Sequence, residues 1–319
     1  MSDAPELIMQ ARHVTKCYPA PGGRTLVAND DVSLNLYRGR TLGVVGESGC
    51  GKSTFLRQLV SLELPTSGEI LFHGQDVTKL RGRKLREHRQ NIQMVFQDPA
   101  LAFNPKMKVA DIICEPLLNF GRIKRKDKEE VACGLLELVE LPGDFARRYP
   151  HNMSGGQRQR VGIARAMALQ PEVIICDEAT CALDVSVQKT VIELLVKLQR
   201  EKGVAYGFVC HDMALVQAFA HQVAVMYLGN VVEVLPGERV AGGCMHPYTQ
   251  AMVGAIFDVN MDFGTPIESI DSEAPSPLDA PKGCPFQNRC ERCKDVCAKV
   301  KPELVEVEAG HQVACHLYA

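Results

Sequence analysis

The stretch GESGCGKS, residues 46–53, constrains the fold of this chain more than any other. It fits the pattern of a glycine, any four residues, and then glycine, lysine and serine or threonine. The apolar residues 41–45 precede it, and residues 52–62 have helical spacing. Glycines let a backbone wrap round phosphate oxygens at a helix N-terminus, where free N–H groups and the helix dipole favour anions. The sequence therefore predicts a strand, a phosphate-binding loop and a helix, in that order.

The end of this loop has the side chains that a nucleotide phosphate needs. Lys52 can reach the β- and γ-phosphates, and the Ser53 hydroxyl can bind Mg²⁺. We interpret Cys50, within the loop, as a small tolerated residue rather than a redox switch. A chance glycine loop is the alternative, and the flanking strand and helix disfavour it.

A second motif, VIICDE at residues 173–178, ends an apolar strand in two carboxylates. Asp177 would hold Mg²⁺ through water, and Glu178 would polarise the water that attacks the phosphate. Alone, the pattern also fits a strand that meets a solvated turn. Its combination with the phosphate loop favours the catalytic interpretation.

A third motif, MSGGQRQRVGIARAMAL at residues 153–169, predicts another helix N-terminus, with Ser154 as the N-cap. This helix end also suits a phosphate. One triphosphate cannot easily use both helix ends within a chain of this size. We therefore expect a second copy or a homologue to supply the second site across an interface.

The composition is that of a folded protein without an obvious affinity for nucleic acid. The chain has 319 residues, of which 46% are hydrophobic and 23% charged, with a formal net charge of -2. It has no apolar run of about 18 residues and no recognisable signal peptide, so we expect neither a membrane span nor secretion. Thirteen cysteines without a signal peptide predict reduced thiols or metal ligands rather than a disulfide framework.

Strands alternate with helices along the chain, which indicates a parallel α/β core. Residues 107–150 are rich in helix and charge, and we expect an amphipathic helix at 186–203 that ends at Gly203. The expected strands, besides those next to the motifs, are 7–18, 32–37, 69–74, 92–96, 205–210 and 222–229.

Together, the motifs resemble those of the ATP-binding subunits of ABC transporters over about residues 7–255. The resemblance implies a P-loop NTPase fold of the α/β class, with a RecA-like core, an antiparallel β subdomain and an α-helical subdomain at about 100–168. It implies an ATP-binding domain at 1–257, followed at 258–319 by a linker and a small C-terminal cysteine-rich extension.

The resemblance also implies the parts that individual residues play. Tyr18 would stack on adenine, and Gln97 would sense Mg²⁺ and the attacking water and face the membrane subunits. Asp184 would cross the dimer seam, and His211 would contact the γ-phosphate. Taken singly, Tyr18 also fits an edge-strand aromatic, Gln97 a solvated loop residue and His211 a histidine at a strand end. The order and spacing of these residues favour the functional interpretation.

The implied site is as follows. The catalytic residues are Lys52, Gln97, Glu178 and His211. The nucleotide-binding residues are Tyr18, Gly46, Glu47, Ser48, Gly49, Cys50, Gly51, Lys52, Ser53, Thr54, Gln97, Ser154, Gly155, Gly156, Gln157, Asp177 and Asp184. The Mg²⁺ ligands are Ser53, Gln97 and Asp177.

Four residues depart from the family pattern. Met153 stands where leucine is usual, Ala179 where proline is usual, and Cys181 and Cys210 where serine is usual. The changes are small, so we expect a site that still hydrolyses ATP.

Two stretches resemble the oligopeptide, dipeptide and nickel importers of this family. They are HPYTQAM at residues 246–252 and LAFNPKMKV at residues 101–109. The resemblance extends to residues 283–315, here named the cysteine segment, and implies a [4Fe–4S] cluster on Cys284, Cys290, Cys297 and Cys315. By their chemistry, four thiolates also suit a tetrahedral Zn²⁺, and loose reduced thiols are the third interpretation. Cys293 is a fifth thiol, which we leave out of the ligand set.

The resemblance implies an ATPase that powers peptide import from the cytoplasmic face of the membrane, as a peripheral subunit. The implied partners are a second, related ATP-binding subunit in a heterodimer, two membrane-spanning permease subunits and an extracytoplasmic solute-binding protein, with no nucleic acid. The alternatives are import of nickel or another small solute, and a soluble ABC ATPase acting on ribosomes or DNA.

Overall fold

A computed structural model describes residues 5–97, 99–181, 183–255, 276, 278 and 280–318, and the chain divides into two compact units. The helical unit comprises Met1–Ile8, Leu36–Arg40 and Lys79–Phe208. The phosphate-loop unit comprises Met9–Asn35, Thr41–Thr78 and Val209–Ala319. The domain boundary expected near residue 257 is not tested by this division and stays a prediction.

The phosphate-loop unit contains a mixed set of strands in the order β11-β12-β10-β9-β3. β3 is parallel to β9, and the other neighbours are antiparallel. Every residue of β3 is buried. These strands are β3 (Thr41–Val45), β9 (Gln222–Tyr227), β10 (Asn230–Pro236), β11 (Val305–Glu308) and β12 (His311–Val313).

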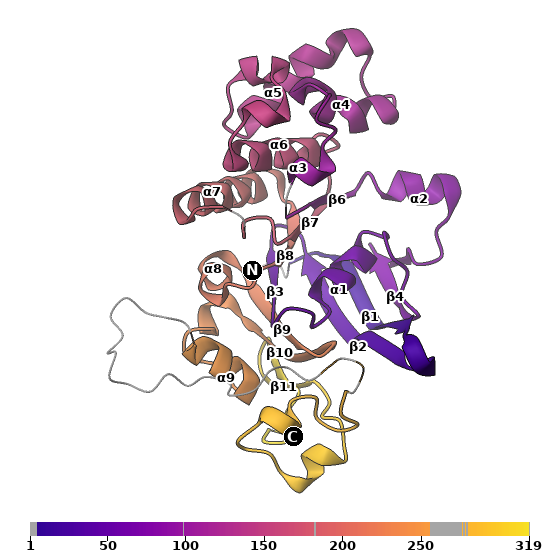
Figure 1. Cartoon of the computed structure of the whole chain (residues 1–319), viewed down its shortest axis with the longest axis vertical. Coiled ribbons are helices and arrows are strands. Elements are labelled where there is room, and N and C mark those ends of the chain that lie inside the picture. The colour runs from indigo at the N-terminus through magenta and orange to yellow at the C-terminus, as the bar shows by residue number, and fades with distance from the viewer. Residues whose placement is uncertain are drawn as a thin grey trace. The chain divides into compact units, whose positions relative to one another are not determined.

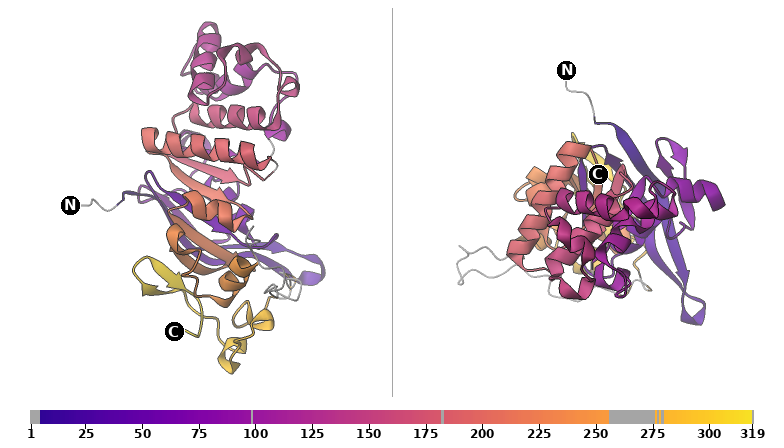
Figure 2. Two further views of the ribbon diagram at one scale, coloured as in Figure 1. Left: turned by 90° about the vertical axis from the view of Figure 1, so that its left-hand side faces the viewer. Right: turned by 90° about the horizontal axis from the view of Figure 1, so that it is seen from above.

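A second sheet has the order β2-β1-β4-β5, and β4 is antiparallel to both of its neighbours. Figure 2 shows β1 and β2 as its two long strands. The strands are β1 (Leu7–Pro19), β2 (Thr25–Tyr37), β4 (Ser67–Phe72) and β5 (Gln75–Asp76). The helices of the unit are α1 (Lys52–Leu59), α8 (Met213–Phe219) and α9 (Pro247–Gly254), with 3₁₀ turns η1 (Pro21–Gly23), η5 (Gly237–Arg239), η7 (Gln287–Arg289) and η8 (Asp295–Ala298).

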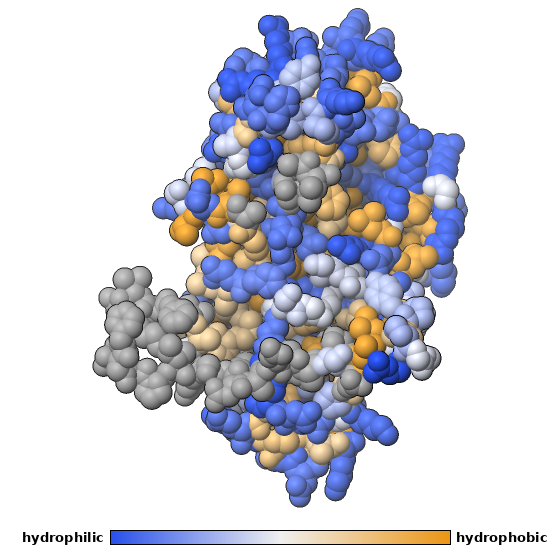
Figure 3. All heavy atoms as spheres, in the orientation of Figure 1, coloured by the Kyte–Doolittle hydropathy of each residue, from blue (hydrophilic) through white to orange (hydrophobic). Residues whose placement is uncertain are grey.

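The helical unit combines three strands, in the order β8-β7-β6, with six helices in its described residues. Figure 1 shows α4, α5 and α6 gathered together, and hydrophilic side chains cover much of their visible surface in Figure 3. Leu117, Ala168 and Leu169 are buried among them. The elements are β6 (Ile92–Val95), β7 (Val173–Asp177), β8 (Ala205–Val209), α2 (Gly82–His88), α3 (Pro99–Ala102), α4 (Val109–Asn119), α5 (Lys128–Leu138), α6 (Gly155–Met167) and α7 (Val185–Lys202), with 3₁₀ turns η2 (Arg125–Asp127), η3 (Gly143–Arg147) and η4 (Pro150–Asn152).

The expected strand at 222–229 is shorter in the structure, because the chain turns there. Leu228 and Gly229 have φ angles of 44° and 78°, in the left-handed region that tight hairpin turns require. The turn joins β9 to β10, a strand that the sequence did not predict. The expected helix at 52–62 also ends early, at Leu59, and Ser61 has a φ of 56°.

Two further expectations concern segments between or beyond these elements. Most of the linker expected at 258–283 lies outside the described residues. Among the described residues, the structure contains no helix that is long and apolar enough to cross a membrane.

Two glycines of the helical unit allow a direct test of these helices. Gly203 ends α7 with a φ of 69°, and Gly134 lies inside α5 with nothing within 4 Å of an added Cβ. We expect Gly203→Ala to lower the free energy of unfolding by about 1 kcal/mol, because a Cβ disfavours the left-handed conformation. Gly134→Ala should raise it by about 1 kcal/mol through helix propensity.

Urea unfolding followed by circular dichroism would measure both effects. An added Cβ at Gly203 comes no nearer than 3.8 Å to a neighbouring atom, so the backbone conformation alone distinguishes the two sites. If both substitutions changed the free energy of unfolding by the same amount and in the same direction, the assigned end of α7 would be wrong.

Candidate active site

The phosphate loop between β3 and α1 depends on glycine at defined positions. Gly46, Gly49 and Gly51 have φ angles of 146°, 77° and 101°. A Cβ on Gly46 would lie 2.1 Å from the Met226 carbonyl oxygen, and one on Gly51 would lie 2.0 Å from the Ala28 carbonyl oxygen. The loop therefore folds tightly against neighbouring backbone, as a phosphate cradle needs.

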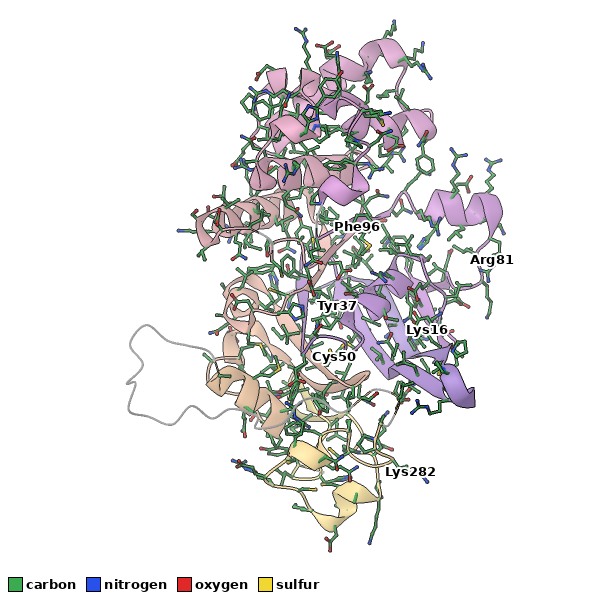
Figure 4. All side chains as sticks on the ribbon, in the orientation of Figure 1. Lys16, Tyr37, Cys50, Arg81, Phe96 and Lys282 are labelled. Atoms are coloured by element: carbon green, nitrogen blue, oxygen red, sulfur yellow. The ribbon has the colours of Figure 1, made fainter. Side chains whose placement is uncertain are left out.

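Lys52 holds the loop together from within. Its Nζ donates to the carbonyl oxygens of Gly46 and Glu47, both at 2.7 Å, and only 4% of the residue is exposed. Cys50, labelled in Figure 4, is also buried, and burial raises the pKa of its thiol. A neutral, buried thiol is poorly reactive, which agrees with the interpretation of Cys50 as a small tolerated residue rather than a redox switch.

A buried asparagine that the sequence did not single out supports the end of the loop. Asn29 Nδ2 donates to the Gly51 carbonyl oxygen at 3.1 Å, and Asn29 Oδ1 accepts from Gln58 Nε2 at 2.7 Å. Asn29 is fully buried in β2. A single asparagine within a strand has no local signal, because its partners lie more than 20 residues away in the chain.

Tyr18, near the end of β1, contacts Glu63, which follows α1, and Lys16 of its own strand. Its hydroxyl donates to Glu63 Oε2, and Lys16 Nζ lies 4.9 Å from the ring centroid. Burial and Glu63 raise the pKa of the hydroxyl, and a hydrogen bond with Thr54 lowers it. Thr54 is in the first turn of α1, so Tyr18 lies beside the helix that begins at the phosphate loop.

His211 is exposed and is the second residue after β8. The next residue, Asp212, caps α8 by accepting the Leu215 N–H at 3.1 Å. The Cys210 thiol accepts the Asp212 N–H at 3.3 Å, so this sulfur makes a hydrogen bond of its own where serine is usual.

The strand β7 ends at Asp177 and is followed by Glu178, as expected. Asp177 is 9% exposed, and Glu178 is half-buried. Glu178 has a φ of 50°, an uncommon conformation for a residue with a Cβ. Burial, followed by the Asp177 charge, raises the pKa of Cys176 to about 12. The two carboxylates thus follow an apolar, buried strand, and the second has a strained backbone.

The N-terminus of α6 forms a complete capping box. Ser154 Oγ accepts the Gln157 N–H at 3.3 Å, and Gln157 Oε1 accepts the Ser154 N–H at 3.0 Å. A Cβ on Gly156 would lie 2.3 Å from Val187 Cγ1 in α7, so glycine permits close packing of the two helices. Asp184 is the N-cap residue of α7.

Gln97 is exposed beyond β6. Phe96, labelled in Figure 4, is 40% exposed, and its carbonyl oxygen accepts from Gln159 Nε2 of α6 at 3.4 Å. This bond joins the loop that contains Gln97 to the helix that begins at Ser154.

The predicted nucleotide residues are thus divided between the two units. The phosphate-loop unit contains Tyr18, residues 46–54 and His211. The helical unit contains Gln97, residues 154–157, Asp177, Glu178 and Asp184.

The cysteine segment joins the sheet of the phosphate-loop unit. β12 pairs with β10, and the Ala314 N–H donates to the Val232 carbonyl oxygen at 2.9 Å. The Cys284 N–H donates to the Cys297 carbonyl oxygen at 2.7 Å. Yellow marks this part of the chain in Figure 1.

The five thiols of this segment interact electrostatically. The pKa of Cys284 is raised to about 12, first by burial and then by Cys297, Cys315 and Cys290. Cys293 is exposed, whereas Cys284, Cys297 and Cys315 are buried. Among the described residues, no three histidine, cysteine, aspartate or glutamate side chains are placed to hold a single metal ion.

Comparison with known proteins agrees with these motifs. The ABC transporter family model matches residues 29–181, and the model of the oligopeptide/dipeptide transporter C-terminal region matches residues 232–297. The oligopeptide transport ATP-binding protein AppF of Bacillus subtilis is 44% identical over 98% of this chain and 98% of its own. The chain belongs to the ATP-binding proteins of the oligopeptide/dipeptide ABC transporters. The dipeptide transport ATP-binding protein DppF of Escherichia coli is 43% identical to this transporter ATPase, over 97% of this chain and 93% of its own.

Solved structures agree on the fold of this transporter ATPase. The ATP-binding cassette MJ0796, solved as a dimer in a post-hydrolysis state with ADP and Pi, has a TM-score of 0.65 and is 30% identical. The match covers 72% of this chain and 99% of that one. The predicted ABC-type ATPase fold is therefore confirmed.

Proposed function

We propose that this chain hydrolyses ATP to drive peptide import through separate membrane-spanning subunits. The observation that carries the proposal is the phosphate loop, in which Lys52 Nζ bonds the loop's own carbonyl oxygens. The loop belongs to a chain whose relatives are named oligopeptide and dipeptide transport ATP-binding proteins. Lys52 can exchange these neutral acceptors for phosphate oxygens, which form stronger, charge-assisted hydrogen bonds.

In the proposed reaction, ATP lies on the phosphate loop of one subunit and on the Ser154–Gln157 motif of another. The attacking water forms a bond to the γ-phosphorus while the bond to the β,γ-bridging oxygen breaks, which gives phosphate and ADP. Glu178 accepts the proton of this water, and His211 contacts the γ-phosphate. Tyr18 stacks on the adenine.

The residues proposed for Mg²⁺ fit its chemistry. Ser53, Gln97 and Asp177 offer hydroxyl, amide and carboxylate oxygens, the hard ligands that this ion takes alongside phosphate oxygens. When bound, Mg²⁺ supplies positive charge that neutralises the phosphate oxygens.

Exposed apolar side chains support contacts with other subunits. Val185 is 82% exposed directly after Asp184, and Phe96 is 40% exposed directly before Gln97. Both side chains are thus accessible to a neighbouring subunit. We assign the first to a related ATP-binding subunit, in a heterodimer, and the second to the permease subunits. The complex would sit on the cytoplasmic face of the membrane with an extracytoplasmic solute-binding protein.

We further propose the ATP-binding domain at 1–257 and the extension at 258–319, with a [4Fe–4S] cluster on Cys284, Cys290, Cys297 and Cys315. Cys284, Cys297 and Cys315 are buried and Cys290 is half-buried, which supports this set, and the exposure of Cys293 supports leaving it out. When bound, the cluster would hold the segment together.

Substitutions in this segment should distinguish a cysteine that binds the cluster from one that does not. We expect Cys290→Ser to abolish the visible absorption of anaerobically purified protein, because serine is a poor ligand for iron. Cys293→Ser, the matched control three residues later, should leave it unchanged. Iron and zinc analysis would accompany the spectra, and colourless wild-type protein with stoichiometric zinc would refute the cluster.

Transport itself is tested in vesicles that contain the complete complex. Peptide bound to the solute-binding protein should stimulate ATP hydrolysis and accumulate inside with ATP present. Stimulation by nickel, or co-purification with ribosomes in place of permeases, would contradict peptide import.

A further inference from the structure

Two segments with no assigned part in the reaction meet at one residue of the phosphate loop, Glu47. The first is the HPYTQAM stretch, which contains Tyr248. The Glu47 N–H donates to the Tyr248 hydroxyl oxygen at 3.0 Å, and Tyr248 is fully buried. His246, the N-cap of α9, accepts the Tyr248 N–H at 3.1 Å and so fixes the start of this helix.

The second segment is the cysteine segment, which reaches Glu47 through Arg289. Arg289 Nη1 donates to both carboxylate oxygens of Glu47, at 3.0 and 2.9 Å, and to the Tyr227 hydroxyl oxygen at 3.3 Å. The Arg289 side chain is only 6% exposed. The Glu47 side chain is 30% exposed, so the pair is half-buried, and loss of Arg289 leaves the Glu47 charge without its partner.

An aromatic cluster fixes the position of Arg289. Phe286, three residues earlier and 2% exposed, lies 5.3 Å from the Tyr227 ring, 5.4 Å from the Tyr248 ring and 5.9 Å from the His246 ring, centre to centre. Rings at these separations pack favourably. The cysteine segment is therefore attached to the core beside the loop, rather than touching it through one flexible side chain.

All the polar groups of Glu47 are thereby occupied. Its carbonyl oxygen accepts from Lys52, its N–H donates to Tyr248, and its carboxylate accepts from Arg289. A carboxylate in a loop that binds a triphosphate repels its own ligand. Arg289 neutralises this charge and holds the carboxylate toward the cysteine segment.

We propose that Arg289 is a positioning residue for ATP binding, through which the cysteine segment holds Glu47 and shields its charge from the phosphates, with Tyr248 fixing the same residue through its backbone. The proposal rests on the proposed ATPase function. It gives the C-terminal segment a direct part in the nucleotide site, whatever its cysteines bind.

The test is the KM for ATP against kcat, measured on the full-length chain in its assembled complex. We expect Arg289→Ala to raise KM about tenfold, because Glu47 then keeps an unpaired charge beside the phosphates, and to leave kcat within about twofold. Arg289→Lys, which keeps the charge, should recover most of the affinity. Arg292→Ala, at an exposed arginine of the same segment, is the matched control and should leave KM unchanged.

Combining Arg289→Ala with Glu47→Gln distinguishes loss of charge neutralisation from a general structural effect of the arginine substitution. In the Glu47→Gln background, Arg289→Ala should cause no further rise in KM, since no carboxylate remains to be neutralised. Unchanged KM in the single variant, or an equal rise in both backgrounds, would overturn the proposal. Absence of ATPase activity in the wild-type complex would instead refute the proposed function.

A milder variant keeps the test decisive if Arg289→Ala does not fold. Tyr248→Phe removes one hydroxyl and should raise KM about fivefold, because the Glu47 N–H loses its acceptor. Tyr206→Phe is the matched control: its buried hydroxyl has no hydrogen-bond partner among the described residues. Equal KM values for the two tyrosine variants would count against the proposal.

Discussion

Replacing Glu178 with glutamine is expected to lower ATP turnover by about 10²–10⁴-fold while ATP still binds. Glutamine has nearly the same size and shape, but it cannot accept a proton from the attacking water. Glu178 follows the fully buried strand β7 and has a φ of 50°, so the backbone there is already constrained. Glu178→Gln keeps this conformation and changes only the chemistry of the side chain.

Single-turnover hydrolysis and equilibrium ATP binding would measure the two effects separately. Glu193→Gln is the matched control, because its exposed carboxylate in α7 pairs only loosely with Lys189, at 3.9 Å. The control should retain wild-type turnover. Turnover near the wild-type value in Glu178→Gln would show that another group accepts the proton.

Elements that begin or end at the sequence motifs were predictable because their signals are local. Residues 42–45 and 173–176 are apolar, and both lie in fully buried strands. The N-cap at Ser154 and the glycine end of α7 were likewise predicted from adjacent residues and are confirmed. In contrast, β12 pairs with β10, about 80 residues earlier, as well as with its neighbour β11, and no local pattern indicates the pairing with β10.

The candidate site shows the same division between local and distant signals. The motif residues could be assigned by their order and spacing, as the family resemblance requires. Arg289 lies 242 positions from Glu47 in the chain, and its importance depends on a fold that brings the two together. The HPYTQAM stretch identified the subfamily from sequence, but only the structure relates Tyr248 to the loop.

Replacing Lys52 with methionine is expected to weaken ATP binding roughly 100-fold, equivalent to about 3 kcal/mol. Methionine keeps the unbranched shape but removes the charge that reaches the β- and γ-phosphates. It also leaves the carbonyl oxygens of Gly46 and Glu47 without the donor that they have at 2.7 Å. The loop thus loses both its attraction for phosphate and an internal support.

Equilibrium binding of ATP and ADP to the full-length protein would check this result. ATP affinity should fall more than ADP affinity, because ADP has no γ-phosphate for the ammonium to contact. Lys189→Met, at an exposed lysine of α7, is the matched control and should bind as the wild type does. An equal loss for both nucleotides would assign the effect to collapse of the loop, whereas a selective loss of ATP supports direct contact with the γ-phosphate. Glu178→Gln is expected to bind ATP but to hydrolyse it slowly, whereas Lys52→Met is expected to bind it weakly, so the two variants separate binding from the chemical step.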